Sequence, residues 1–211
     1  MSIPFEALSV GESDVLVVID PQVDFCPGGA LAVAGGDEVM APINALARRF
    51  AHVAVTQDWH TPDQISFASN HPGRRPFETI EVAYGPQTLW PDHCLQGSAG
   101  AAFHPGLDLP QAELILRKGF RPQVDSYSAF FENDRATATG LAGYLRERGL
   151  TRCVFVGLAL DFCVRYSALD AVREGFGSVV IPAACRAIDL DGSAAATLAA
   201  FAAAGVTLAD L

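Results

Sequence analysis

The stretch from residue 152 to residue 175 constrains the fold most, because its hydrophobic pattern changes abruptly from that of a strand to that of a helix. Residues 153–156 form a short apolar run that stops at Gly157, which predicts a buried strand. From Asp161 onward the apolar residues recur at three- and four-residue steps, and Gly175 ends this helical pattern. A strand that passes directly into a helix is typical of α/β proteins.

Cys163 lies in the first turn of this predicted helix. Unpaired amide N–H groups and the positive end of the helix dipole meet at such a turn. We therefore expect the thiol to lose its proton easily, and the thiolate is the nucleophilic form. The alternative is a structural role, because free cysteine often packs as a small apolar residue. The stretch makes Cys163 a candidate nucleophile and leaves the structural role open.

The rest of the chain alternates in the same way between apolar runs and helical patterns. Strands are expected at residues 14–19, 53–56, 112–117, 179–181 and 206–208, and helices after residues 35–37 and at residues 136–148 and 193–204. The nearly continuous aliphatic run at 14–19 suits an inner parallel strand that is covered on both faces. With 211 residues, half of them hydrophobic, the chain is too short for two large domains. The pattern predicts a single three-layer, doubly wound α/β domain over residues 1–211, with a mainly parallel sheet.

Composition and charge exclude several classes of function. The formal charge is −10 and no block is rich in lysine or arginine, so nucleic acid is not expected as a partner. No uninterrupted apolar run approaches the length of about 18 residues that indicates a membrane span, and no export signal is evident. The 5 cysteines contain no CxxC pair, which argues against a disulfide framework and for a cytoplasmic location. With nucleic acid and membrane excluded, we expect a small-molecule substrate as the partner. Exposed sheet edges or loops could in addition support a homo-oligomer.

Charged residues follow the predicted strands where each strand ends. Asp20 comes after the strand at 14–19, and Lys118 after the strand at 112–117. Open α/β sheets place their sites at the carboxyl ends of their strands. A turn or cap role is the alternative for Asp20, and we favour that role for Asp24. A solvated side chain is the alternative for Lys118. The repetition makes Asp20 and Lys118 candidates for the same site.

A metal site is predicted at the end of the strand at 53–56. Asp58 and His60 are two residues apart, so their side chains can point to the same side of an extended chain. The irregular region at about 60–110 could bring His93 back to them, and we expect it to bind both metal and substrate. Two imidazoles and one carboxylate with open positions are typical of a catalytic metal site, and they suit Zn, Fe or Mn. His71 and His104 fit better as solvated loop residues.

Several segments together resemble the isochorismatase-like cysteine hydrolases, and within them the nicotinamidases (pyrazinamidases). They are VVIDPQVDFCPGGALAV, TQDWH, LWPDHCLQGSAGAAFHP, LRKGF and GLALDFCV. The resemblance runs from about residue 15 to residue 181. Members of the family without the metal ligands tend to act on other substrates, including isochorismate and N-carbamoyl compounds. The presence of all three ligands therefore favours nicotinamidase, whereas Leu160, where many nicotinamidases have threonine, leaves the fine specificity open.

The resemblance implies a role for each of a set of residues. They are a catalytic triad of Asp20, Lys118 and Cys163; an oxyanion hole from the N–H groups of Ala159 and Cys163; one divalent metal ion on Asp58, His60 and His93, with Ser66 nearby; and a slot for the substrate ring from Phe25, Trp90 and Tyr127. A cis peptide bond would fall at Leu158–Ala159.

The implied reaction is hydrolysis of nicotinamide to nicotinate and ammonia through a cysteine thioester. The resemblance also implies that pyrazinamide is a further substrate and that the enzyme acts in NAD salvage. A related hydrolase acting on another small carboxamide is the main alternative. A metal-binding or thiol-redox protein without catalysis would not need Asp20 and Lys118 beside the cysteine. A Rossmann dinucleotide binder would carry GxGxxG after the first strand, and this chain does not.

Overall fold

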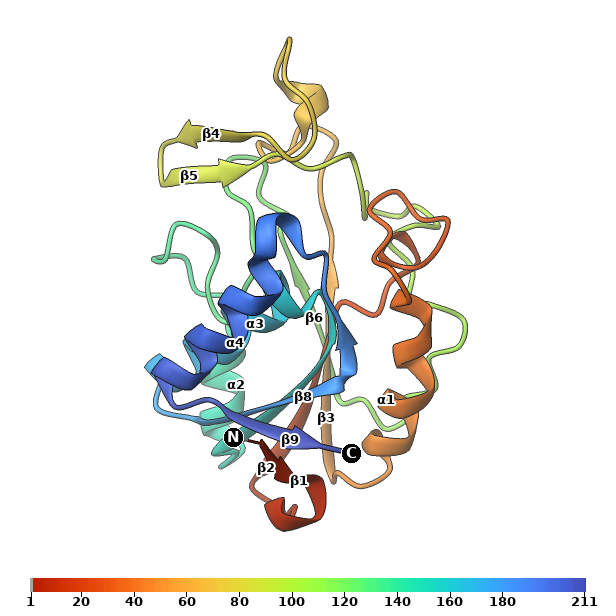
Figure 1. Ribbon diagram of the computed structural model, residues 1–211, viewed down its shortest axis with the longest axis vertical. Helices are drawn as coiled ribbons and strands as arrows, with labels where there is room; N and C mark the ends of the chain where they lie inside the picture. Colours follow the sequence, from red (N-terminus) through yellow and green to blue (C-terminus); the bar gives the residue numbers. More distant parts are fainter. Residues whose placement is uncertain (1) are drawn as a thin grey trace.

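The computed structural model describes residues 2–211. Its centre is a 7-stranded sheet in the order β1-β9-β8-β7-β2-β3-β6, in which the paired strands run parallel (Figure 1). The strands are β1 (Ser2–Pro4), β2 (Asp14–Ile19), β3 (His52–Asp58), β6 (Leu114–Lys118), β7 (Arg152–Leu158), β8 (Gly177–Arg186) and β9 (Thr207–Asp210). The order places β7, β2, β3 and β6 side by side, so the four ends that carry the candidate site residues are neighbours.

Helices cover both faces of this sheet. Helix α1 (Met40–Ala47) lies on one face, and helices α2 (Leu141–Glu147), α3 (Arg165–Arg173) and α4 (Ser193–Ala204) lie on the other (Figure 1). Strand β2 is buried along its whole length, and its side chains belong to the hydrophobic cores on both faces of the sheet. Leu16 and Val18 pack with α1, while Val15 and Val17 pack with α2, α3 and α4. Alternate side chains of a strand point to opposite faces, so this division confirms the predicted three-layer, doubly wound α/β fold.

The predicted elements agree with the structure in position and differ at some bounds. The strand at 14–19 and the helix at 193–204 match β2 and α4 residue for residue. The helix predicted at 136–148 was wrong at its start, because it begins only at Leu141. The Asp134 carboxylate accepts hydrogen bonds from the N–H groups of Ala136 and Thr137, which holds this segment in a turn. Gly140, with a φ of 103°, then precedes the helix.

The long segment between β3 and β6 is ordered and carries elements that the sequence did not predict. It contains an antiparallel hairpin of β4 (Thr79–Val82) and β5 (Gly85–Thr88), and it extends beyond the carboxyl ends of the large sheet (Figure 1). Isolated bridges join His60 to Leu95 and Phe67 to Trp90. Buried aromatic side chains therefore fold this segment over the end of the sheet where the site residues lie.

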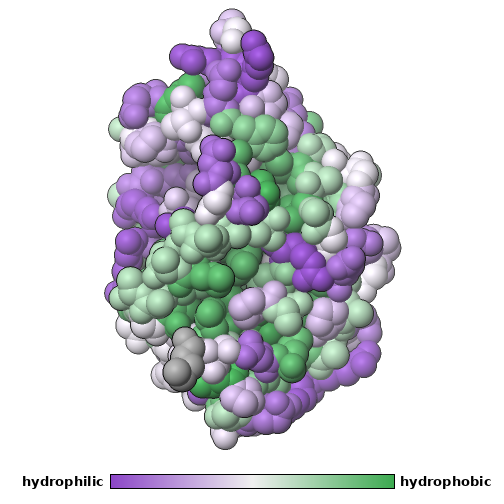
Figure 2. Space-filling view, viewed as in Figure 1, coloured by the Kyte–Doolittle hydropathy of each residue, from purple (hydrophilic) through white to green (hydrophobic). Residues whose placement is uncertain are grey.

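Figure 2 shows hydrophobic residues gathered near the centre of one face and hydrophilic residues at the tip above the hairpin, where Figure 1 places the loop before β4. All 5 cysteines of the chain are buried and free, as expected from the absence of a disulfide pattern. None of the helices within residues 2–211 has both the length and the apolar character needed to cross a membrane.

Candidate active site and metal centre

The carboxyl ends of four neighbouring strands bring the predicted triad and the predicted metal ligands to one place. Asp20 directly follows β2, Asp58 ends β3 and Lys118 ends β6. Cys163 lies in the turn after β7, within a single π-helical turn (Leu160–Val164) that leads into α3. Cys163 Sγ and one carboxylate oxygen each of Asp20 and Asp58 lie within 4.8 Å of one another. The triad and the metal cluster are therefore adjacent parts of one site.

Lys118 joins these two parts. Its side chain is fully buried, and Nζ lies 2.8 Å from Asp20 Oδ2 and 2.5 Å from Asp58 Oδ1. The same ammonium lies 3.5 Å from Cys163 Sγ and donates a hydrogen bond of 2.9 Å to the carbonyl of Ser126. Burial alone lowers the pKa of Lys118, but the two carboxylates outweigh it and hold the pKa well above its usual range. Lys118 thus stays cationic; sequence reasoning linked it to Asp20 and missed its contact with Asp58.

The Asp20 carboxylate is held by a residue that sequence reasoning also missed. Thr56 Oγ1 donates a hydrogen bond of 2.6 Å to Asp20 Oδ1, and the Asp20 N–H donates to Thr56 Oγ1 at 3.0 Å. Burial raises the pKa of Asp20 to about 6, and Lys118 limits the rise. At neutral pH the carboxylate is ionised and able to accept a proton. The period-two spacing of Thr56 and Asp58 on β3 is the signal that could have revealed Thr56.

The expected acidity of Cys163 was wrong. Burial raises the pKa of the thiol well above its usual range, and the nearby carboxylates of Asp20 and Asp58 add to the rise, while Lys118 opposes it. The helix start is not enough to offset these effects, because the thiol is enclosed rather than exposed to water. Cys163 is therefore a neutral thiol in the resting site and needs a base to take its proton.

The turn before Cys163 has the backbone geometry that the family resemblance implies. The peptide bond Leu158–Ala159 is cis. Ala159 and Cys163, whose N–H groups are the predicted oxyanion hole, both line the same cavity. Gly157 precedes this turn with a φ of 114°, and a Cβ atom there would lie 2.1 Å from the carbonyl oxygen of Ile19. Only glycine fits at this point, where β7 pairs with β2.

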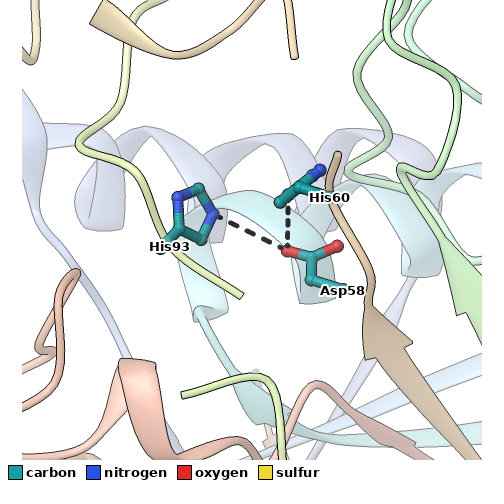
Figure 3. Close-up of side chains that lie close together, drawn as sticks. All are labelled: Asp58, His60 and His93. Carbon is teal, nitrogen blue, oxygen red and sulfur yellow. Dashed lines mark ion pairs between the residues drawn. The ribbon is translucent and has the colours of Figure 1, made fainter. Parts of the chain in front are cut away.

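Asp58, His60 and His93 each offer one ligand atom within 4.8 Å of the others. His60 Nδ1 lies 2.9 Å from the carbonyl of Gly119, and His93 Nδ1 lies 2.8 Å from the carbonyl of Pro91. An Nδ1–H that donates to a carbonyl leaves Nε2 with its lone pair. Both Nε2 atoms face Asp58 Oδ2, at 3.6 and 4.0 Å (Figure 3). Two nitrogens and one oxygen therefore converge, while the other oxygen of Asp58 contacts Lys118.

The ionisation of these groups also suits metal binding. Burial raises the pKa of Asp58, but Lys118 and the two imidazoles outweigh it and hold the pKa well below its usual range. Burial and the neighbouring His60 lower the pKa of His93 to about 4, so this imidazole is neutral. For His60, burial lowers the pKa, but the carboxylates of Asp58 and Asp125 outweigh it and raise the pKa. The carboxylates of Asp58 and Asp125 thus favour a positive charge at His60.

Ser66 provides an independent test of whether the site fits a metal. Its hydroxyl oxygen is buried and has no hydrogen-bond partner within residues 2–211. The next residue, Phe67, packs its ring against the rings of both His60 and His93, at 5.4 and 5.5 Å. A buried hydroxyl is costly unless an ion or a water satisfies it. Together with the nitrogen and oxygen donors of the cluster, it fits a divalent ion.

Gly119 supports His60, which gives a testable expectation. It has a φ of 68°, and a Cβ atom there would lie 2.4 Å from Cε1 of His60. Gly119→Ala should therefore displace the imidazole and weaken metal binding by about tenfold or more. Gly149 has a φ of 70° and nothing within 4 Å of the same atom, so Gly149→Ala carries a similar backbone strain of about 1–2 kcal/mol without the clash. Elemental analysis after dialysis against zinc compares the two; equal metal content would contradict this role of Gly119.

The site opens into a cavity of about 320 Å³, including its mouth. All three aromatic residues predicted for the substrate slot, Phe25, Trp90 and Tyr127, line it. Sequence reasoning missed the other members of the lining, namely Leu31, Asp125, Phe162 and Ile188. They come from separate segments and carry no shared motif. The mainly apolar lining, with a few polar side chains, is typical of a small-molecule site.

Hydrogen bonds fix the aromatic walls of this cavity. The Tyr127 hydroxyl accepts a hydrogen bond from Trp90 Nε1 at 3.0 Å and another from Gln87 Nε2 at 2.8 Å. The ring of Phe162 meets Trp90 edge to face, with 4.8 Å between centroids. Gln87 is a residue of β5, so the unpredicted hairpin helps to hold the wall. The slot is thus formed before any ring enters it.

Two residues that were not expected to belong to the site, His71 and Asp24, make hydrogen bonds to the backbone. His71 Nε2 lies 2.7 Å from the carbonyl of Ile65, and His71 is not part of the metal cluster. Asp24 accepts hydrogen bonds from the N–H groups of Cys94 and Ala30, at 2.7 and 3.2 Å. Asp24 therefore ties two loops together, in keeping with the turn or cap role that we favoured.

Comparison with protein families matches the model described as "Isochorismatase domain" to residues 14–211. A nicotinamidase of Acinetobacter baylyi is 57% identical over 178 residues, which cover 84% of this chain and 83% of the relative. A nicotinamidase of Escherichia coli is 41% identical over 201 residues, which cover 93% of this chain and 94% of the relative.

Solved structures give the same result. A nicotinamidase and pyrazinamidase of Acinetobacter baumanii superposes with a TM-score of 0.94 and 52% identity over 95% of this chain and 97% of its own. PnC1 of L. infantum in complex with nicotinate has a TM-score of 0.85 and 38% identity, with 100% and 96% covered. A pyrazinamidase of Pyrococcus horikoshii in complex with zinc has a TM-score of 0.77 and 30% identity, with 94% and 99% covered.

Proposed function

Because the chain belongs to the isochorismatase domain family, we propose that it is a nicotinamidase, an amidase that hydrolyses nicotinamide to nicotinate and ammonia and also accepts pyrazinamide. The observation that carries the proposal is the position of Lys118, which contacts Asp20, Asp58 and the Cys163 thiol. The proposed nucleophile and the proposed metal ligands line one cavity with mainly apolar walls, and the proposed base, Asp20, lies within 4.8 Å of the nucleophile. The nicotinamidase relatives support the choice of substrate.

In the first half of the proposed reaction, Cys163 Sγ attacks the carboxamide carbon. Asp20 takes the thiol proton as general base and then delivers it to the amide nitrogen, which leaves as ammonia. The negative charge that develops on the carbonyl oxygen is stabilised by the N–H groups of Ala159 and Cys163. Loss of one such donor typically costs on the order of 100-fold in rate. The product of this half-reaction is a thioester between Cys163 and the nicotinoyl group.

In the second half, water attacks the thioester. Asp20 again acts as base: it takes a proton from the water and returns it to the sulfur as the C–S bond breaks. Lys118 serves both halves, because its charge keeps Asp20 ionised at the start of each half, when the carboxylate must accept a proton. The neutral resting state of the Cys163 thiol is consistent with this scheme, since the base rather than a preformed thiolate starts the reaction.

Asp58, His60 and His93 would hold one divalent ion, Zn, Fe or Mn, with Ser66 close to it. When bound, the ion would provide a Lewis acid for the ring nitrogen of the substrate. Phe25, Trp90 and Tyr127 enclose the ring and orient the carboxamide towards Cys163. The zinc in the Pyrococcus horikoshii pyrazinamidase and the nicotinate in PnC1 of L. infantum support these two parts of the proposal.

The proposed substrate is tested by the rates of ammonia release from a panel of amides. We expect nicotinamide and pyrazinamide to be hydrolysed with far higher kcat/KM than benzamide, which lacks the ring nitrogen, and than an aliphatic amide such as isobutyramide. A site that acts on another small carboxamide is the alternative. High activity on isobutyramide with none on nicotinamide would favour that alternative and would leave the roles of Cys163 and Asp20 unchanged.

Metal removal should abolish turnover without unfolding the protein. Chelation leaves Asp58, His60 and His93 in place but removes the ion that would position the ring, so we expect kcat/KM for nicotinamide to fall by about 100-fold or more. Added zinc, manganese or iron should restore it. Ammonia release and circular dichroism before and after chelation measure both effects. Full activity in a sample that elemental analysis shows to be free of metal would contradict the metal dependence.

A further inference from the structure

Asp125 is a buried carboxylate in the wall of the same cavity that no step of the proposed reaction uses. It lies in the loop after β6 and is 2% exposed. Oδ1 accepts a hydrogen bond of 2.8 Å from the N–H of Ser126, and Oδ2 accepts one of 3.3 Å from Gln87 Nε2. It lines the cavity beside Asp58, His60 and His93.

In the part of the chain that the structure describes, the Asp125 carboxylate forms no ion pair with a lysine or an arginine. Within residues 2–211 its only ion pair at 4.0 Å or less is with the imidazole of His60, where Oδ1 lies 4.0 Å from Nε2. The same Nε2 lies 3.6 Å from Asp58 Oδ2. The ligand atom of His60 therefore faces two carboxylates. Burying a carboxylate without an opposite charge is costly, so a cation at this point would offset a large penalty.

The charges of the buried site support the same conclusion. Three carboxyl side chains, those of Asp20, Asp58 and Asp125, lie around this part of the site, and Lys118 contacts the first two of them. Asp125 Oδ1 instead faces the His60 imidazole. A divalent ion on Asp58, His60 and His93 would therefore lie close to a carboxyl group that Lys118 does not contact.

We propose that Asp125 is a further acidic residue of the metal site, whose negative charge strengthens the binding of a divalent ion held by Asp58, His60 and His93. The inference rests on the proposed metal site. The hydrogen bond from the Ser126 N–H does not by itself require a charge, because an asparagine oxygen could accept it equally well, whereas the amide nitrogen of asparagine could not accept from Gln87 Nε2. The charge is thus the property that distinguishes this role from one in loop structure alone.

The test is the affinity of the metal-free full-length protein for zinc, measured by competition with a chromophoric zinc indicator. Asp125→Asn removes the charge and keeps the size of the side chain, and we expect it to bind zinc about tenfold more weakly. Asp63→Asn is the matched control, since it removes an exposed carboxylate from the loop that follows His60 and should leave the affinity unchanged. Asp125→Glu, which keeps the charge, should bind more tightly than Asp125→Asn. Circular dichroism and Tm of the metal-free variants check that each is folded.

The outcomes separate this inference from the proposed function. An Asp125→Asn protein with the zinc affinity of the wild type would overturn the inference, and a raised KM for nicotinamide would then assign Asp125 to the substrate instead. A wild-type protein that binds no zinc would overturn the metal site as well. If Asp125→Asn does not fold, Asp125→Ser removes the same charge with a smaller side chain that still offers an oxygen to Ser126. The same tenfold weakening is expected of it, and unchanged affinity would overturn the inference.

Discussion

Replacing Cys163 with alanine is expected to abolish the hydrolysis of nicotinamide while the protein remains folded. Among residues 2–211, Cys163 alone offers a thiol in the lining of the cavity. Loss of a nucleophile that acts in concert with its base typically costs at least about a thousandfold in kcat. Steady-state ammonia release measures the loss, and circular dichroism with zinc binding shows that the fold and the metal cluster persist.

Cys153→Ala is the control for this substitution. Cys153 is also buried, but it lies within β7 and packs in the core. Its loss should lower stability by about 1 kcal/mol and leave the activity of the folded protein unchanged. If Cys163→Ala retained more than a few per cent of wild-type activity, Cys163 would not be the nucleophile.

Replacing Lys118 with methionine should be nearly as damaging to activity and should also destabilise the protein. Methionine has a similar length but no charge, so the carboxylates of Asp20 and Asp58 would face each other without their cation. Breaking a buried ion pair by removing one partner typically costs about 3–5 kcal/mol. The pKa of Asp20 should rise further, so less of the base is ionised at pH 7. We expect kcat to fall by about 100-fold or more and Tm to fall in the metal-free protein.

Arg152→Met is the control that separates a loss of stability from a loss of activity. Arg152 makes two hydrogen bonds of 2.7 Å to the carboxylate of Asp14, which is also buried, at the opposite end of the sheet. Its loss should lower Tm without lowering the kcat of the folded protein. If Lys118→Met lowered Tm but retained the kcat of the wild type, Lys118 would be a structural residue only.

The sequence predicted those parts of the fold and site that depend on local pattern. The aliphatic run of β2 and the alanine-rich α4 have strong periodicity and were predicted residue for residue. Asp20, Asp58 and Lys118 could each be singled out because they end or follow a strand. Their actual contacts depend on the strand order, in which β2, β3 and β6 are neighbours, and this order is a property of the whole sheet. For that reason the contact between Lys118 and Asp58 was not foreseen.

Other parts of the site depend on how loops close over the sheet, and no local pattern encodes them. Gln87 and Asp125 become buried only because the β4–β5 hairpin and the loop after β6 pack together. The thiol of Cys163 was expected to be acidic from its place at a helix start. Tertiary burial reversed this effect, because it excludes water and brings two carboxylates close to the sulfur. Ionisation is thus the property that local sequence predicted least well.

The central claim is that nicotinamide is hydrolysed through a thioester on Cys163, and partitioning with hydroxylamine tests it most directly. Hydroxylamine competes with water for a thioester and yields nicotinohydroxamate instead of nicotinate. Nicotinamide and methyl nicotinate differ only in their leaving groups, so both would form the same nicotinoyl thioester. We predict that the ratio of hydroxamate to nicotinate is identical for the two substrates at each hydroxylamine concentration. Different ratios, or consumption of nicotinamide without hydroxamate, would contradict a common thioester on Cys163.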